Sequence, residues 1–245
     1  MKKLRLSEER AKALYKDASQ VERAILEDTF GIEALIKKGE SFVCIYPRPQ
    51  GVWCLTKDHR AFKAADIEVK WDRDDLLGVG VVTEDLAFIV HPGPSVVLPW
   101  GNPDTSIDAP ALFDTDSVDF ETATRAIVAA HEGVKTKWCD DDRFEYVGAP
   151  AAQWCRDLPG GNWHLPTLRV LKSMSEHIGQ INECLRAFGC HIVGPGYHWS
   201  STAKKDAPRC AFVVLMNDGS VCYSHMLTYY CVRAVSAFHF EDFKF

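Results

Sequence analysis

Hydrophobic and polar positions along the chain predict one helical segment, then short strands, then helices, then strands again. Apolar side chains recur at helical spacing after Ser7, a favourable N-cap, and Gly31 ends the run. Between residues 41 and 97, short apolar runs are bounded by Pro, Gly, Asp or Lys, which is typical of strands. The pattern therefore predicts an N-terminal helical segment over residues 1–39 and a β-rich region over residues 40–118.

The pattern of apolar and polar positions over residues 119–245 predicts helices that lead into a terminal antiparallel sheet. Helical spacing begins at Asp119, returns near residues 149–156, and starts again at Pro166, where a proline in the first helical turn loses no hydrogen bond. A strand pair follows, joined by the hairpin signal Asn-Asp-Gly at 217–219. The predicted fold class is α+β, with mixed helices and short antiparallel strands. The β-rich region is either a separate subdomain or part of this unit.

Composition limits the classes of partner. The 245 residues carry a net charge of -6, which argues against nucleic acid, since nucleic-acid-binding proteins usually present a basic face. No run of 18 apolar residues predicts a membrane span. The first residues are positive but lack the apolar core of a secretory signal, so we expect synthesis in the cytoplasm, with delivery to a virion or a surface left open.

The nine cysteines predict neither a disulfide framework nor a zinc site. Their number is odd and no C-x-x-C pair occurs, so free thiols are expected, with a disulfide between Cys210 and Cys222 across the hairpin as an open alternative. Acidic runs at 114–116 and 140–142 are interpreted as solvated turns rather than calcium ligands, and Gly78-Val79-Gly80 does not complete a dinucleotide fingerprint. No metal and no cofactor are predicted.

Three ordered motifs lie in the last third of the chain: W-H-L-P-T at 163–167, G-Y-H-W-S-S at 196–201, and Y-C-V-R-A-V at 230–235. This set, over residues 120–238, resembles the C-type-lectin-fold variable proteins of diversity-generating retroelements and related uncharacterised bacterial and phage ligand-binding domains. Formylglycine-generating enzymes share that fold. The resemblance implies a C-type lectin fold with a display surface over residues 119–245. It assigns structural roles to Trp163, Pro166, Trp199, Ser200 and Arg233.

Alternation around the hairpin separates two faces of the predicted sheet. The resemblance places Phe212 inward, with Val221 and Tyr223 on the return strand. The outward set is chemically mixed, which is typical of a surface diversified for binding rather than of an active site or a solvated face. A second layer packed over this face is the alternative. The predicted ligand-binding face consists of His198, Arg209, Ala211, Val213, Leu215, Cys222, Ser224, His225, Leu227 and Tyr229.

The function expected from this face is non-enzymatic recognition of a protein or glycan ligand on a target surface, of the phage receptor-binding or bacterial adhesin type. The N-terminal helix packs on the core or on its equivalent in another chain, so a homo-oligomer remains an alternative. A second hypothesis is a copper-dependent thiol oxidase using Cys222 and Cys231, although the R-G-G-S-W segment of that enzyme family is absent here. A third is an intracellular interaction protein without diversification.

Overall fold

The computed structural model describes residues 4–5, 43–44, 50–67, 71–107, 109–137, 145–160, 162–239 and 242–244. The chain forms two compact units, residues 1–49 and 50–245. In the first unit, β1 (Leu4–Arg5) pairs antiparallel with β2 (Val43–Cys44). The helix predicted after Ser7 lies outside the described residues.

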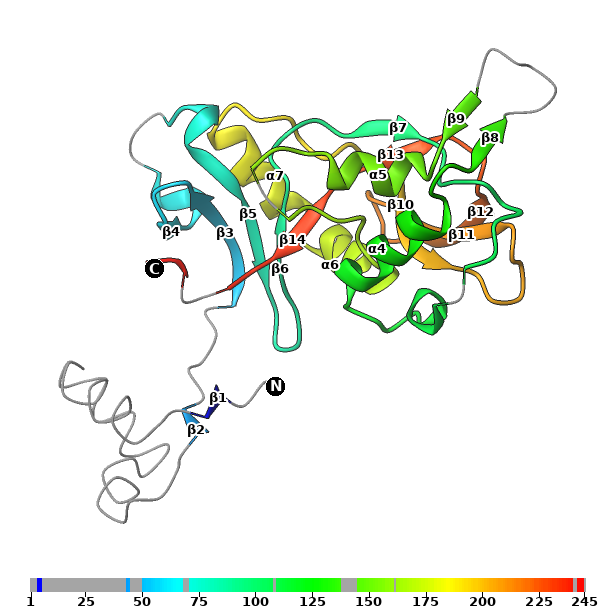
Figure 1. The fold of residues 1–245 in the computed structure, drawn as a ribbon. Coiled ribbons are helices and arrows are strands. Elements are labelled where there is room, and N and C mark those ends of the chain that lie inside the picture. Colours follow the sequence, from blue (N-terminus) through cyan, green and yellow to red (C-terminus); the bar gives the residue numbers. More distant parts are fainter. Residues whose placement is uncertain are drawn as a thin grey trace. The chain divides into compact units, whose positions relative to one another are not determined.

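The second unit contains two five-stranded sheets (Figure 1). Sheet 1 has the order β14-β6-β5-β3-β4, and all neighbouring strands within it pair antiparallel. Its strands are β3 (Gly51–Thr56), β4 (Ala61–Phe62), β5 (Leu76–Val82), β6 (Ala87–Val90) and β14 (Val235–Ala237). Val79, near the middle of β5, has Cys54 opposite on one side and Val90 on the other.

Sheet 2 has the order β12-β11-β10-β13-β7, and its neighbours are antiparallel except for the parallel pair β10 and β13. Its strands are β7 (Val96–Leu98), β10 (Tyr197–Ala203), β11 (Cys210–Leu215), β12 (Val221–His225) and β13 (Tyr230–Val232). A separate hairpin joins β8 (Lys135–Lys137) to β9 (Glu145–Val147). Because β7 pairs with β13 and β6 pairs with β14, each sheet contains strands from both predicted regions, residues 40–118 and residues 119–245.

Two helices of the second unit, α4 (Phe120–Ala130) and α6 (Leu168–Glu176), begin where a side chain caps the helix. Asp119 accepts a hydrogen bond from the Thr122 N–H at the start of α4, and Thr167 accepts one from Val170 at the start of α6. Pro166 therefore precedes the cap of α6 instead of occupying its first turn. The α-helices are α4 (Phe120–Ala130), α5 (Pro150–Arg156), α6 (Leu168–Glu176) and α7 (Ile178–Ala187). Short 3-10 turns are η1 (Ala64–Asp66), η2 (Arg73–Asp75) and η3 (Pro110–Phe113).

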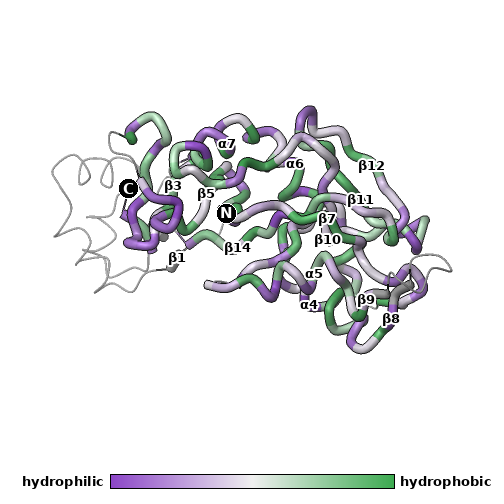
Figure 2. The backbone as a smooth tube through the Cα atoms, turned by 90° about the horizontal axis from the view of Figure 1, so that it is seen from above, coloured by the Kyte–Doolittle hydropathy of each residue, from purple (hydrophilic) through white to green (hydrophobic). Residues whose placement is uncertain are grey.

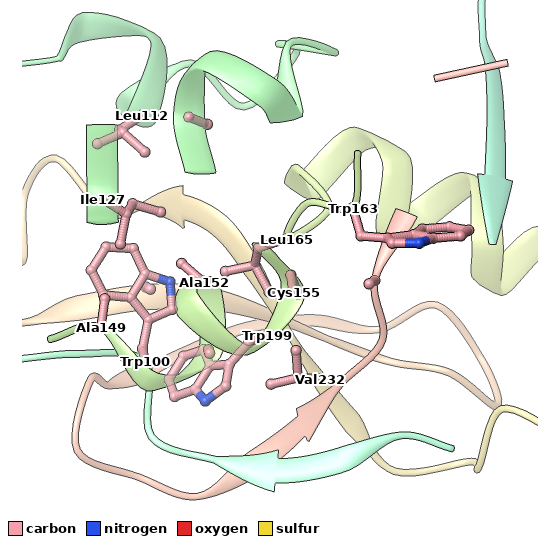
Figure 3. Close-up of a cluster of buried hydrophobic side chains, with 14 of the residues drawn as sticks. Trp100, Leu112, Ile127, Ala149, Ala152, Cys155, Trp163, Leu165, Trp199 and Val232 are labelled. Carbon is pink, nitrogen blue, oxygen red and sulfur yellow. The ribbon is translucent and has the colours of Figure 1, made fainter. Parts of the chain in front are cut away.

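Two buried clusters hold these layers together. In one cluster Trp199 and Val232 of sheet 2 pack with Ile127 of α4 and Ala152 of α5 (Figure 3). In the other, Val214 of β11 packs with residues of sheet 1, α6 and α7. Sheet 2 is thus covered on both faces at its centre, and β11 is hydrophobic along its length (Figure 2).

The α+β prediction, with helices and mainly antiparallel sheets, is confirmed at this level. None of the helices in the described part of the chain has the length and apolar character needed to cross a bilayer.

Candidate binding surface

The three sequence motifs meet at the junction of the two sheets. The Ser201 N–H donates to the Pro166 carbonyl at 2.7 Å, which joins the first motif to the second. His198 pairs with Cys231 across the parallel strands, which joins the second motif to the third. His164 forms an isolated bridge with Val235, which closes the set. Residues far apart in the sequence therefore support one region of the fold.

Buried tryptophans fix the centre of sheet 2. The Trp199 indole Nε1 donates to the Leu98 carbonyl at 3.0 Å, and the Trp100 Nε1 donates to the Ser200 carbonyl at 2.8 Å. The Ser200 hydroxyl donates to the Phe212 carbonyl at 2.8 Å. Each large ring thus buries its apolar area while its N–H is satisfied, which holds β7, β10 and β11 in register.

A buried guanidinium and two imidazoles lie where the third motif passes between the sheets. Arg233 is fully buried, and its Nη2 donates to the His191 carbonyl at 2.5 Å. Its Nε and Nη1 have no partner among the described residues. Burial lowers the pKa of Arg233 to about 10 and those of His91 and His198 to about 4, with the arginine charge contributing to both histidine shifts. Both imidazoles are therefore neutral at pH 7.

The prediction that His198 is solvent-accessible is wrong. The side chain is fully buried, and its Nδ1 makes a 2.9 Å hydrogen bond with the Gly196 carbonyl. The physical reason is the central position of β10, which has β11 and β13 as neighbours in the sheet and has the helices α4 and α6 packed against it.

Two further members of the predicted face are buried for the same reason. Val213 is opposite Trp199 in the register, and both Val213 and Ala211 belong to the same buried cluster as Trp199. The second-layer alternative is therefore correct for these positions. Conversely, Val221 and Tyr223 were predicted inward but are 40% and 56% exposed, because β12 is an edge strand.

The remaining predicted face residues are at least partly accessible. Arg209 is exposed and forms an ion pair with Asp104. On β12, Cys222 and His225 are exposed and Ser224 is half-buried. The other half-buried members are Leu215, Leu227 and Tyr229.

Tyrosines gather where sheet 2 opens to solvent. The Tyr230 ring makes edge contacts with Trp199 at 5.1 Å and with Tyr197 at 5.6 Å between centroids. The Tyr197 hydroxyl lies 3.9 Å from the Cys222 Sγ, and Leu215 is opposite Tyr197 in the register. All of these residues except Trp199 are half-buried or exposed.

A second tyrosine pair, Tyr146 and Tyr229, is connected to the pair of Tyr197 and Tyr230 because Tyr229 directly precedes Tyr230 in the chain. The hydroxyls of Tyr146, on β9, and Tyr229 are 2.6 Å apart, and their rings meet at 6.2 Å. Burial and the bond to Tyr146 raise the pKa of Tyr229 to about 12. We call Tyr146, Tyr197, Tyr229 and Tyr230 the tyrosine cluster. It contains four of the seven tyrosines in the chain, and a binding surface concentrates this residue type.

Sequence reasoning found only Tyr229 of this cluster. A usable signal existed for Tyr197, because it lies two residues before Trp199 and thus on the same face of β10. Tyr146 carries no such signal, since it reaches Tyr229 from a separate hairpin.

The thiols of the proposed oxidase pair do not meet. Cys222 is on β12 and Cys231 on β13, three strand spacings apart, which corresponds to roughly 14 Å. The alternative of a disulfide between Cys210 and Cys222 is also wrong, because the register places Cys210 opposite His225 and Cys222 opposite Val213. Asp114 and Asp116 form a local turn in which the Asp116 N–H donates to the Asp114 carboxylate. Within the described ranges, no three His, Cys, Asp or Glu side chains are grouped as metal ligands.

Comparisons with known proteins give a likeness of fold. No protein-family model matches the chain, and no curated protein sequence matches it. A solved structure of a fimbrial protein from Bacteroides ovatus ATCC 8483 is similar, with a TM-score of 0.55 and 11% identity. The alignment covers 76% of this chain and 48% of the fimbrial chain, so this chain spans about half the length of that neighbour.

Proposed function

We propose that this chain is a non-enzymatic binding protein with a C-type lectin fold, and that the tyrosine cluster contacts a protein or glycan on a target surface. The fold part of the proposal is supported by the meeting of the three motifs at the sheet junction. The fimbrial neighbour, a protein named for a surface structure, is compatible with an adhesin-type role.

The observation that carries the proposal is the tyrosine cluster on a rigid support. Tyr230 rests against the buried Trp199, and Tyr229 is held by the hydroxyl of Tyr146. A tyrosine offers a large amphipathic contact area and loses little side-chain entropy on binding. A recognition site is most effective when its residues are held by packed elements in this way.

The chemistry of the cluster favours a ligand with apolar faces and hydroxyl groups. Phenol rings present apolar surface to a sugar face or to an aliphatic side chain, and their hydroxyls accept or donate hydrogen bonds. Recognition of a glycan by this route requires no calcium ion. Diversification by a retroelement would act on the exposed residues around the cluster, notably Cys222 and His225.

The first experiment identifies a ligand. Labelled full-length protein is applied to a glycan array and to intact bacterial cells, beside a double variant Tyr197→Ala with Tyr229→Ala. Signals on defined glycans or cells that the double variant lacks are expected. The control is Tyr223→Ala, which removes an exposed tyrosine on the face of β12 opposite to Cys222. This variant is expected to bind normally. Equal signals from the double variant and wild type would contradict the proposal.

A further inference from the structure

Strand β12 is an edge of sheet 2 whose outward backbone groups have no partner in the described part of the chain. The Leu215 N–H donates to the Ser220 carbonyl at 2.9 Å where β12 begins. Hydrogen-bonded pairs alternate along an antiparallel ladder, so every second residue from Ser220 onward directs its N–H and C=O to β11. The backbone groups of Val221 and Tyr223 therefore point away from the sheet, where no described backbone group bonds to them.

The other described ends of the two five-stranded sheets are protected. Isolated bridges to Lys244 and His164 cover the strands next to β4 and β14. β7 is flanked by Pro94 and Pro99, and a proline has no N–H to donate to a further strand. Residues 221–225 contain no proline, lysine or carboxylate, which are the residues that prevent edge pairing elsewhere. Of these described ends, β12 is therefore the one open to another strand.

The side chains of β12 fit a strand of the same sequence. Val221, Cys222 and Tyr223 are all exposed. When two β12 strands pair antiparallel about Cys222, Val221 of each copy lies opposite Tyr223 of the other, and these two residues exchange their free N–H and C=O groups. A β-branched side chain opposite an aromatic ring is a favourable cross-strand pair. The strand is thus complementary to itself.

We propose that two copies of the chain pair through β12 in this register and that a disulfide between their Cys222 residues fastens them at the two-fold axis. Cys222 then faces its equivalent in a non-hydrogen-bonded pair, with Cα atoms about 4.5 Å apart, and a disulfide spans about 4.4–6.8 Å. A register centred on Tyr223 would need the His225 carbonyl, which already accepts from the Thr228 N–H at 2.8 Å.

Charge and area both favour a second copy as the occupant. Residues 221–225 carry no lysine, arginine or carboxylate, so the edge offers nothing to a charged peptide and meets no repulsion from its equivalent. The register also brings the turn that contains Asp218 beside His225 of the second copy, which can carry a positive charge. One strand edge is much smaller than a stable interface of about 1,600 Å² in total, so the reduced pair dissociates and the disulfide maintains the dimer.

A small-molecule disulfide such as oxidised glutathione is the oxidant, and the exposed thiol gives it access. The Cys222 thiolate attacks one glutathione sulfur, a mixed S–S bond forms, and one glutathione thiolate leaves and takes up a proton. The Cys222 thiolate of the second copy attacks the Cys222 sulfur of the mixed disulfide, the protein S–S bond forms, and the other glutathione leaves with the second proton. Two protein thiols and one glutathione disulfide thus give one protein disulfide and two glutathione thiols.

The dimer places both tyrosine clusters on one face. The two-fold axis is perpendicular to the joined sheet, so each face of one copy continues into the same face of the other. Cys222 lies on the face of Tyr197, whose hydroxyl is 3.9 Å from its Sγ. Two clusters therefore flank the disulfide, which gives the dimer two binding sites for one target surface. This consequence rests on the proposed function, whereas the dimer itself does not.

The test uses the full-length protein without any ligand, in reduced glutathione and then in oxidised glutathione. Light scattering after gel filtration measures the mass, and a non-reducing digest is mapped by tandem mass spectrometry. Oxidation is expected to double the mass and to give a Cys222–Cys222 peptide, and a dithiol is expected to reverse both. A monomer that carries glutathione on Cys222, or a dimer linked through another cysteine, would overturn the proposal.

Matched variants separate strand pairing from chance collision of thiols. Cys222→Ser is expected to stay monomeric, and Cys210→Ser, which removes a half-buried thiol of β11, is expected to dimerise. Tyr223→Pro removes an outward N–H and is expected to prevent the dimer, whereas Tyr223→Ala keeps that N–H and the dimer. A covalent dimer of Tyr223→Pro as abundant as that of wild type would contradict pairing through β12.

Melts establish that each variant is folded before its mass is compared. Should Tyr223→Pro fail to fold, Val221→Pro removes the other outward N–H and is held to the same expectation. Because no ligand is present, a monomer here leaves the glycan and cell experiment unaffected, and a failure of that experiment leaves the dimer unaffected.

Discussion

The centre and the edge of sheet 2 carry similar alternating sequences but have opposite environments. Val213 on β11 is 1% exposed, whereas Val221 on the neighbouring β12 is 40% exposed. The first is the register partner of Trp199 on the adjacent strand β10, and the second belongs to a strand with a partner on one side only. Position in the strand order, more than alternation, therefore decides which residues are available for binding.

The largest expected effect is at the centre. Trp199→Ala removes a fully buried indole and its bond to the Leu98 carbonyl, and is expected to destabilise the fold by about 3–5 kcal/mol. Tyr223→Ala at the edge is expected to change stability by less than about 0.5 kcal/mol. Denaturant unfolding of both variants measures the contrast. Similar losses would mean that β12 is covered.

The next largest effect is a dependence of stability on pH, which arises from His198 at the centre of sheet 2. The folded-state pKa of His198 is about 4, below its ordinary value of 6.5, because the side chain is buried. Between these pH values the unfolded chain binds a proton that the folded chain does not, so stability is full above pH 6.5 and falls as the pH drops towards 4. The contribution of His198 is about 3 kcal/mol.

Unfolding curves across this pH range, for wild type and His198→Asn, measure that contribution. An asparagine amide can still donate to the Gly196 carbonyl but does not titrate. The variant is expected to show a shallower loss of stability, because His91 and His164, whose pKa values burial also lowers, still contribute to the slope. An unchanged slope would show that His198 is not buried as a neutral imidazole.

The smallest difference comes from matched valines. Val213→Ala opens space beside Trp199 and is expected to cost roughly 2 kcal/mol, whereas Val221→Ala is expected to cost less than about 0.5 kcal/mol. Thermal melts of the two variants sharpen the comparison because the same atoms are removed. Equal melting temperatures would refute the distinction between centre and edge.

Local features of this fold are readable from the sequence. The cap at Asp119 marks the start of α4, and Gly219, with a φ of 73°, completes the hairpin turn between β11 and β12. Each depends on neighbours within a few residues, so short-range chemistry is sufficient to specify it.

The strand order of sheet 2 is not readable in this way. β10 is central because β13 adds beside it in parallel, and that pairing joins His198 to Cys231. The burial of His198 and Val213 follows from this long-range contact and from the layers of α4, α5 and α6. The tyrosine cluster depends likewise on the β9 hairpin, which brings Tyr146 to Tyr229.

The most direct test of the proposed binding surface is a titration of the ligand identified on the array or on cells. Calorimetry would compare wild type with Tyr229→Ala and Tyr223→Ala, after melts show that both variants are folded. Tyr229→Ala is expected to weaken binding by about 2 kcal/mol, roughly thirtyfold in Kd, and Tyr223→Ala to leave it unchanged. Unchanged affinity in Tyr229→Ala, or an equal loss in Tyr223→Ala, would contradict the assignment of recognition to the tyrosine cluster.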